Sequence, residues 1–245
     1  MTGSDRKTGL STKIMMAIIG GTYGGINRRS DEPNRKLRRD KMTVCIAMIA
    51  NTTKEGSSTI VFAADREVSH PAVKFEGGFP KIEFLHVHAY IMASSNDALE
   101  SDDIILKTKQ RISNKECTVR DIVDILSEEV KLKYDNELEE KRKLIFTRYH
   151  VTPKEFKSKA KSKLISDEVK IDLIDGLNKT EYEFRMNCPD TNFLVVGIDT
   201  APHIWVVDQL GNKKTRYRKG FAAIGTGNTL AYAEITRLLH YTTYE

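Results

Sequence analysis

From residue 43 onward, apolar and polar positions group into blocks typical of strands. Residues 43–50 and 59–64 are β-prone apolar runs bounded by polar turn residues, and they predict a hairpin of buried strands. Residues 81–85 and 88–93 predict a second pair of strands. The first half of this region is therefore expected to form β-structure.

Helical patterns follow these strands. Polar residues 94–96 precede several acidic residues, a sequence typical of a helix N-terminus, and Ile104, Ile105 and Ile112 then recur at helical spacing. Thr118 and Asp121 resemble a capping box at the start of a second helix. The highly charged residues 131–180 predict further helices with solvated faces, one starting at Thr152 before a proline.

The last part of the chain returns to strands. Residues 193–198, 203–208, 215–218 and 221–228 predict four strands, and a final helix follows a Gly-rich turn. Strands, helices, strands and a helix in this order indicate an α+β sheet-and-helix sandwich, since alternating βαβ units are absent.

The first 42 residues differ from the rest and form a basic, irregular extension. They carry ten Lys and Arg against four Asp and Glu, a net charge of +6, which leaves −1 for residues 43–245 of the chain's +5. Three explanations remain: a removable pro-segment, a targeting peptide, or translated sequence upstream of a true start at Met42. Residues 20–25 are rich in glycine but lack the Gly-Lys-Ser/Thr of a phosphate loop, so a linker is expected.

Charge and composition exclude several classes of protein. Because the basicity lies in the extension, no nucleic-acid partner is expected for the folded part, and the longest apolar stretch is too short for a membrane span. Three widely spaced cysteines suit a reducing, cytoplasmic location. His86 and His88 are the closest pair of histidines, but no metal site is predicted from them.

Thr43 follows Met42 at the junction between the extension and the folded part. If residues 1–42 were removed, or if translation began at Met42 and the methionine were trimmed, Thr43 would carry a free α-amine. With an ordinary pKa of about 7.7 to 8.0, that amine can accept the proton of its own hydroxyl, so one residue supplies nucleophile and base.

Five segments of the folded part carry the recognisable motifs of the chain: residues 43–47, 60–66, 79–83, 90–94 and 221–233. In this order they resemble the landmarks of proteasome β-type subunits, and most closely the prokaryotic proteasome-like members of the N-terminal-nucleophile (Ntn) hydrolases. The resemblance covers essentially all of residues 43–245.

The resemblance implies a four-layer αββα sandwich and a set of site residues. Thr43 matches the nucleophile, Lys81 the lysine that favours loss of the hydroxyl proton, and Asp65 the acid that pairs with this lysine. Ser94 stands where the family has a glycine whose backbone N–H polarises the substrate carbonyl, and Thr226 matches a serine that supports the threonine amine.

The chain also departs from the family. The interval from Thr43 to Asp65 is several residues longer than usual, which predicts a longer hairpin tip at residues 51–58. The family continues with more strands after the last helix, so the sandwich is expected to be incomplete at the C-terminus, with an exposed sheet edge.

The functional expectation is a threonine-type hydrolase that cleaves peptide or other amide bonds through an acyl-enzyme, with no cofactor or metal and with assembly into a homo-oligomer. One alternative is a catalytically inactive, structural or regulatory proteasome-like subunit, in which Asp65 and Lys81 form only a structural ion pair. Another is a nucleic-acid or membrane-surface binder that uses the basic extension.

Overall fold

The computed structural model places the strands in two larger sheets and one small one. It describes residues 13–19, 44–52, 57–65, 67–69, 74–76, 81–95, 98–158, 164–188, 190–216 and 219–242. The first sheet has the spatial order β1-β3-β2-β11. Its strands are β1 (Lys13–Ile19), β2 (Cys45–Thr52), β3 (Ser57–Asp65) and β11 (Phe221–Ile224).

The second sheet has the order β10-β9-β8-β7-β6, and each neighbouring pair is antiparallel. Its strands are β6 (Ile82–His86), β7 (Ala89–Ser94), β8 (Asn192–Ile198), β9 (Pro202–Val207) and β10 (Lys213–Thr215). The short strands β4 (Glu67–Ser69) and β5 (Lys74–Glu76) form a separate hairpin.

The two larger sheets pack face to face through apolar side chains. Alternate residues of β2 and β3, such as Ala47 and Phe62, meet alternate residues of β7 and β8, such as Met92 and Leu194, and all four are at most 1% exposed. This alternation follows from the period of two along a strand, which sends every second side chain into the same core.

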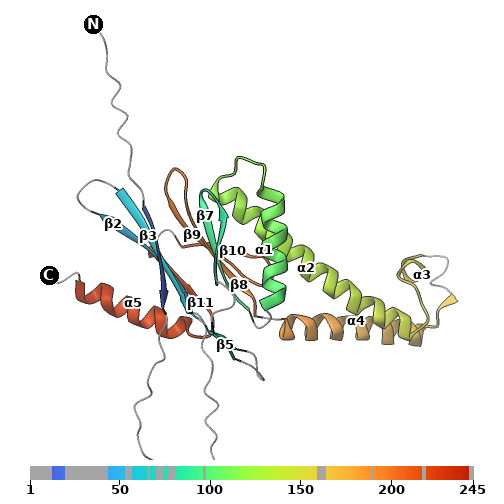
Figure 1. Cartoon of the computed structure of the whole chain (residues 1–245). Coiled ribbons are helices and arrows are strands. Elements are labelled where there is room, and N and C mark those ends of the chain that lie inside the picture. The colour runs from blue at the N-terminus through green and yellow to red at the C-terminus, as the bar shows by residue number, and fades with distance from the viewer. Residues whose placement is uncertain are drawn as a thin grey trace, which may run out of the picture.

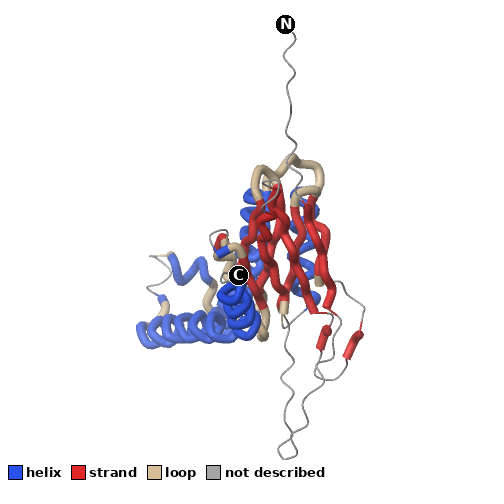
Figure 2. Tube along the Cα trace, turned by 90° about the vertical axis from the view of Figure 1, so that its left-hand side faces the viewer, coloured by secondary structure: helices blue, strands red, loops and turns tan. Residues whose placement is uncertain are grey.

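Helices pack against both larger sheets. Helices α1 (Ala98–Ile112) and α2 (Val119–Arg148) pack on the second sheet, and Ile122 and Phe193 belong to the core between them. Helix α5 (Asn228–Thr242) contacts β11 of the first sheet and lies in front of the strands in Figure 2. The arrangement confirms the predicted α+β class.

Helices α2 and α4 form an arm that extends away from the sheets (Figure 1). Helix α2 is 30 residues long, and its second half packs against α4 (Asp167–Asn187), with the short α3 (Pro153–Lys157) at the tip. Capping boxes at Thr118 and Thr152 confirm the two predicted helix starts. The first residues of the predicted 131–180 region, however, continue α2, since no breaking residue interrupts it before Arg148.

Three details differ from the sequence-based expectations. Residues 13–19, within the extension predicted to be irregular, form β1, which pairs in parallel with β3 and covers its edge. The tip at 51–58 is shorter than predicted, because Asn51 pairs with Ser58 and Thr52 with Ser57 in the ladder. Strand β10 spans Lys213–Thr215 and so begins two residues before the strand predicted at residues 215–218. Among the described residues, no helix is long and apolar enough to cross a bilayer.

Candidate active site

The candidate site lies where both sheets end beside the start of β2. Thr43 itself lies outside the described residues, but the next residue, Val44, is placed. The carbonyl of Val44 accepts a 3.1 Å hydrogen bond from the main-chain amide of Asp65, at the end of β3. The register of the β2–β3 hairpin, in which Cys45 opposes Ala64, brings these two residues together.

Asp65 and Lys81 form an ion pair, as predicted. The Lys81 ammonium donates to the Asp65 carboxylate, and the two side chains are 12% and 25% exposed. Asp65 belongs to the first sheet, whereas Lys81 directly precedes β6 of the second. The pair therefore links the two sheets, and each charge offsets the cost of burying the other.

Cys45 lies within electrostatic range of this pair. Burial raises the pKa of its thiol to about 12, with a lowering contribution from Lys81 and a raising one from Asp65. The thiol also donates a 3.7 Å hydrogen bond to the carbonyl of Ala93. Cys45 packs as a small core residue, since it is fully buried.

Ser94 reaches the same region from the second sheet. It is the last residue of β7, follows Ala93, pairs with Asn192 in β8, and is 7% exposed. Because Ile82 pairs with Met92, the start of β6 beside Lys81 lies next to this end of β7. The serine hydroxyl thus belongs to a largely buried position at the end of the strand.

Thr226 lies in the turn that follows β11. Ile224, the last residue of that strand, pairs with Cys45, so the turn begins at the end of the sheet where β2 starts. Gly225 has a φ of 96°, a left-handed conformation that favours glycine, and its carbonyl accepts from the amide of Asn228 at the start of α5. The turn leaves Thr226 exposed.

Four of the five predicted residues, Asp65, Lys81, Ser94 and Thr226, therefore lie at the end of the sheets where β2 starts. The fifth, Thr43, lies outside the described residues and directly precedes Val44 in the chain. Sequence reasoning missed the main-chain partners, the carbonyls of Val44 and Ala93. Every residue has a main-chain carbonyl, so residue types do not indicate which carbonyl accepts a hydrogen bond. Only the hairpin register could have indicated these contacts.

Within the described ranges, no group of three His, Cys, Asp or Glu side chains is placed to hold a metal ion. His86 and His88, the closest histidines in sequence, stack with ring centroids 5.4 Å apart, and His88 Nδ1 lies 3.1 Å from the Ile198 carbonyl. These contacts are those of a structural pair at the β6–β7 turn.

No protein-family model matches the chain, and no curated protein matches it either.

Proposed function

We propose that the chain is a proteasome-like Ntn hydrolase that cleaves peptide or other amide bonds through an acyl-enzyme on Thr43. The observation that carries the proposal is the Asp65–Lys81 pair beside Val44, the residue that follows Thr43. The proposal includes the four-layer αββα sandwich of this superfamily and self-association of the chain.

The proposed reaction begins with a free α-amine on Thr43, so the bond between Met42 and Thr43 must be absent. The amine accepts the hydroxyl proton while the oxygen attacks the substrate carbonyl carbon. Lys81 acts by its positive charge, which stabilises the developing alkoxide and disfavours protonation of the nearby amine. Asp65 keeps the ammonium in place.

The carbonyl oxygen becomes negatively charged in the tetrahedral intermediate. The backbone N–H of Ser94 is the proposed donor to this oxyanion, and a backbone donor is independent of the serine side chain. The carbon–nitrogen bond then breaks, and the leaving amine takes the proton held by the Thr43 amine. Water hydrolyses the resulting ester, which releases a carboxylic acid and restores the Thr43 hydroxyl. The Thr226 hydroxyl is proposed to support the amine, directly or through water.

The test combines the identity of the N-terminus with activity. N-terminal sequencing of protein purified from its native host, together with hydrolysis of a panel of fluorogenic peptide amides, should give a Thr43 terminus and cleavage in the same preparation. A preparation with Thr43 at its terminus that cleaves no amide would contradict the catalytic role.

A second candidate is a catalytically inactive subunit of the same fold. The pairing of β1 with β3 favours it, because this strand belongs to the segment that precedes Thr43. While that segment remains attached, the Thr43 nitrogen is part of a peptide bond and is not a base. Intact protein with a Met1 terminus and no amidase activity is the outcome expected for this candidate.

A further inference from the structure

Strand β1 occupies one edge of the first sheet and lies beside β3 (Figure 1). Its seven residues pair with β3 in one unbroken parallel register, from Lys13 opposite Thr59 to Ile19 opposite Asp65. Among the described elements, β3 is the one that β1 contacts extensively. Without β1, the main chain of β3 would therefore form an open sheet edge, and the other strand pairings of the described fold would remain.

The connection between β1 and β2 is much longer than its ends require. Both ends flank Asp65, because Ile19 pairs with this residue and the carbonyl of Val44 accepts a hydrogen bond from its amide. Neighbouring strands lie about 4.8 Å apart, so Ile19 and Val44 are separated by about 10 Å, which three or four residues can span. The sequence places 24 residues, 20–43, between them. A tight turn therefore does not fix β1 to its partner, and β1 is in effect a tethered ligand of β3.

The edge that β1 occupies combines an extended backbone with apolar side chains. Every second residue of β3 faces the core between the sheets and is at most 3% exposed. These residues are Ile60, Phe62 and Ala64. The positions of β1 that pair with them are apolar as well. They are Ile14, Met16 and Ile18. Such an edge binds an extended segment through main-chain hydrogen bonds and favours an apolar residue at alternate positions.

The direction of β1 leads toward the candidate site. Because β1 runs parallel to β3, its C-terminal end lies at Asp65, which is paired with Lys81. A polypeptide bound in the same way would carry its next residues past this ion pair. About three or four of them would reach the start of β2, where Val44 follows Thr43.

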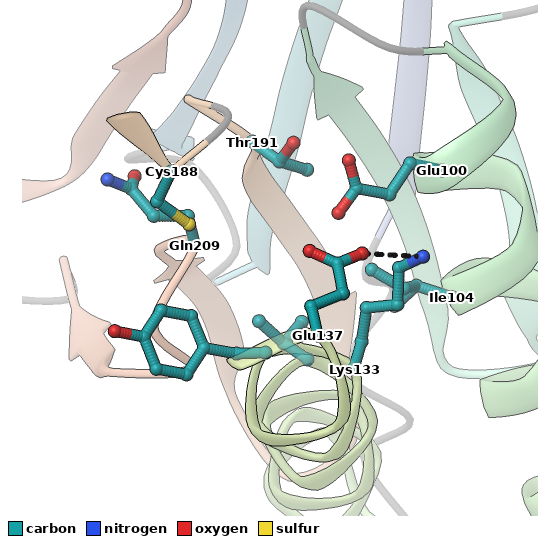
Figure 3. A pocket seen from close by; sticks show the side chains of 9 residues that line it. Glu100, Ile104, Lys133, Glu137, Cys188, Thr191 and Gln209 are labelled. Carbon is teal, nitrogen blue, oxygen red and sulfur yellow. Dashed lines mark ion pairs between the residues drawn. The ribbon is translucent and has the colours of Figure 1, made fainter. Parts of the chain in front are cut away.

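The pocket of the helical layer does not suit a peptide of this length. It lies between α1, α2 and Cys188 at the end of α4 (Figure 3). Glu100 and Glu137 line it, and Lys133 pairs with Glu137 at 2.8 Å. Its volume of about 290 Å³ is at the lower limit for a drug-sized ligand and is too small for a seven-residue strand.

We propose that the edge of β3, residues 59–65, is a binding site for an extended apolar polypeptide segment, with β1 as its tethered occupant. The free ligand is a polypeptide substrate whose cleaved bond follows the bound segment. The role as a substrate site rests on the proposed function, whereas the binding of a peptide does not. In the intact chain the tether holds β1 at an effective concentration of about 1 mM, so a free peptide at micromolar concentration does not displace it.

Opening the edge in the full-length chain tests the binding site. The double substitution Met15→Pro and Met16→Pro removes two main-chain N–H groups from β1 and disrupts its ladder. Arg28→Pro with Arg29→Pro is the matched control, since it places two prolines in the same leader outside β1. The probe is a fluorescein-labelled synthetic peptide with the sequence of residues 10–22, and its binding is measured by fluorescence anisotropy.

We expect the opened variant to bind this peptide at least tenfold more tightly than the parent or the control variant. A peptide with prolines at the positions of Met15 and Met16 should not bind. Equal affinity of the parent, the control and the opened variant would overturn the proposal.

A second measurement keeps β1 intact, in case the opened variant does not fold. Cysteines are introduced at Ala17 and Ala63, which pair in the ladder, together with Cys188→Ser. The remaining cysteines, Cys45 and Cys117, are buried. The synthetic peptide at about 1 mM should slow disulfide formation between positions 17 and 63 about twofold, because it competes with β1 at a similar effective concentration. An undiminished rate, or equal slowing by the proline-containing peptide, would refute exchange at this edge.

Cleavage kinetics test the role in substrate binding. The opened variant with a Thr43 terminus is given fluorogenic amides that carry the sequence of residues 13–19 four residues before the cleaved bond. KM should be at least tenfold lower than for the same amides with prolines at the positions of Met15 and Met16. Equal KM values would reject the substrate role. Binding of the peptide with no cleavage of any amide would contradict the proposed function and would still support the binding site.

Discussion

The main-chain amide of Asp65 donates a hydrogen bond to the carbonyl of Val44, the residue that follows Thr43. This 3.1 Å bond fixes the end of β3 relative to the start of β2, and so it fixes the Asp65 side chain relative to the chain entering the site. Because Asp65 also holds Lys81, one residue connects the proposed nucleophile strand to the proposed activating charge. Three predictions concern this region and a fourth concerns the helical layer.

Thr43→Ala should abolish amide cleavage while leaving the fold intact. The substitution removes the hydroxyl that the proposal uses as nucleophile, so kcat/KM should fall at least about 10³-fold. The thermal unfolding midpoint of the variant should match that of the parent protein. Thr43→Ser is the control, since it keeps both hydroxyl and amine and should retain measurable activity. Retained cleavage by the alanine variant would reject the mechanism.

Substitutions of the ion pair separate catalytic from structural roles. Lys81→Ala leaves a largely buried Asp65 carboxylate unpaired and should lower the free energy of unfolding by about 1–3 kcal/mol. The double variant Asp65→Asn, Lys81→Met removes both charges and should regain part of this stability.

Activity should not return with stability in the double variant, because the proposed role of Lys81 requires its charge. We expect a loss of at least about 10²-fold in kcat for both the single and the double variants. Activity comparable to the parent in the stable double variant would leave the pair with a structural role alone.

Cys45 should be inert toward thiol reagents in the folded protein. Burial raises its pKa to about 12, so the reactive thiolate is essentially absent at pH 7 to 9, and the side chain is inaccessible. Iodoacetamide at pH 8.5 should modify the half-buried Cys188 and leave Cys45 unmodified until the chain is unfolded. Peptide mapping by mass spectrometry measures both sites, and equal rates at Cys45 and Cys188 would contradict this environment.

Asp199 should make the fold sensitive to acid. Burial alone would raise the pKa of this carboxyl, but hydrogen bonds from the Val119 amide, His203 and the Thr200 amide outweigh burial and lower it to about 2. The Val119 contact, at 2.9 Å, ties the start of α2 to the β8–β9 turn. Since the folded pKa lies below the unfolded value of about 3.9, the stabilisation is present above pH 4 and lost as pH falls toward 2.

The Asp199 contribution is about 2 kcal/mol at neutral pH. Urea unfolding at pH 6 and pH 3 should therefore show a stability loss in the parent chain that is smaller in Asp199→Asn. The substitution of an exposed carboxyl, Glu116→Gln, is the control and should leave the pH dependence unchanged. An equal pH dependence in the parent and the Asp199 variant would contradict the assignment.

The sequence was sufficient for the elements that local patterns define. The hairpin of β2 and β3, the capping boxes at Thr118 and Thr152 and the order of strands and helices all follow from short-range signals, and the structure confirms them. The ion pair of Asp65 and Lys81 was predicted from the family resemblance, since sixteen residues separate the two and no local rule joins them.

Other features depend on tertiary contacts that the sequence does not encode locally. The apolar residues of β1 were interpreted as part of an irregular extension, because a single short strand becomes stable only beside a partner, here β3. The exposed apolar side chains of α4, such as Ile171 and Tyr182, were not distinguished within the charged region 131–180, since the covered and exposed faces of the helix differ only when α2 is in place.

The position of β1 changes what a cut before Thr43 would release. Severing one peptide bond there would turn the preceding segment into a separate peptide, yet the seven-residue ladder between β1 and β3 would still hold it by non-covalent bonds. If the proposed cleavage occurs, the molecule would then consist of two polypeptides that copurify, with β1 as an edge strand of the proposed enzyme.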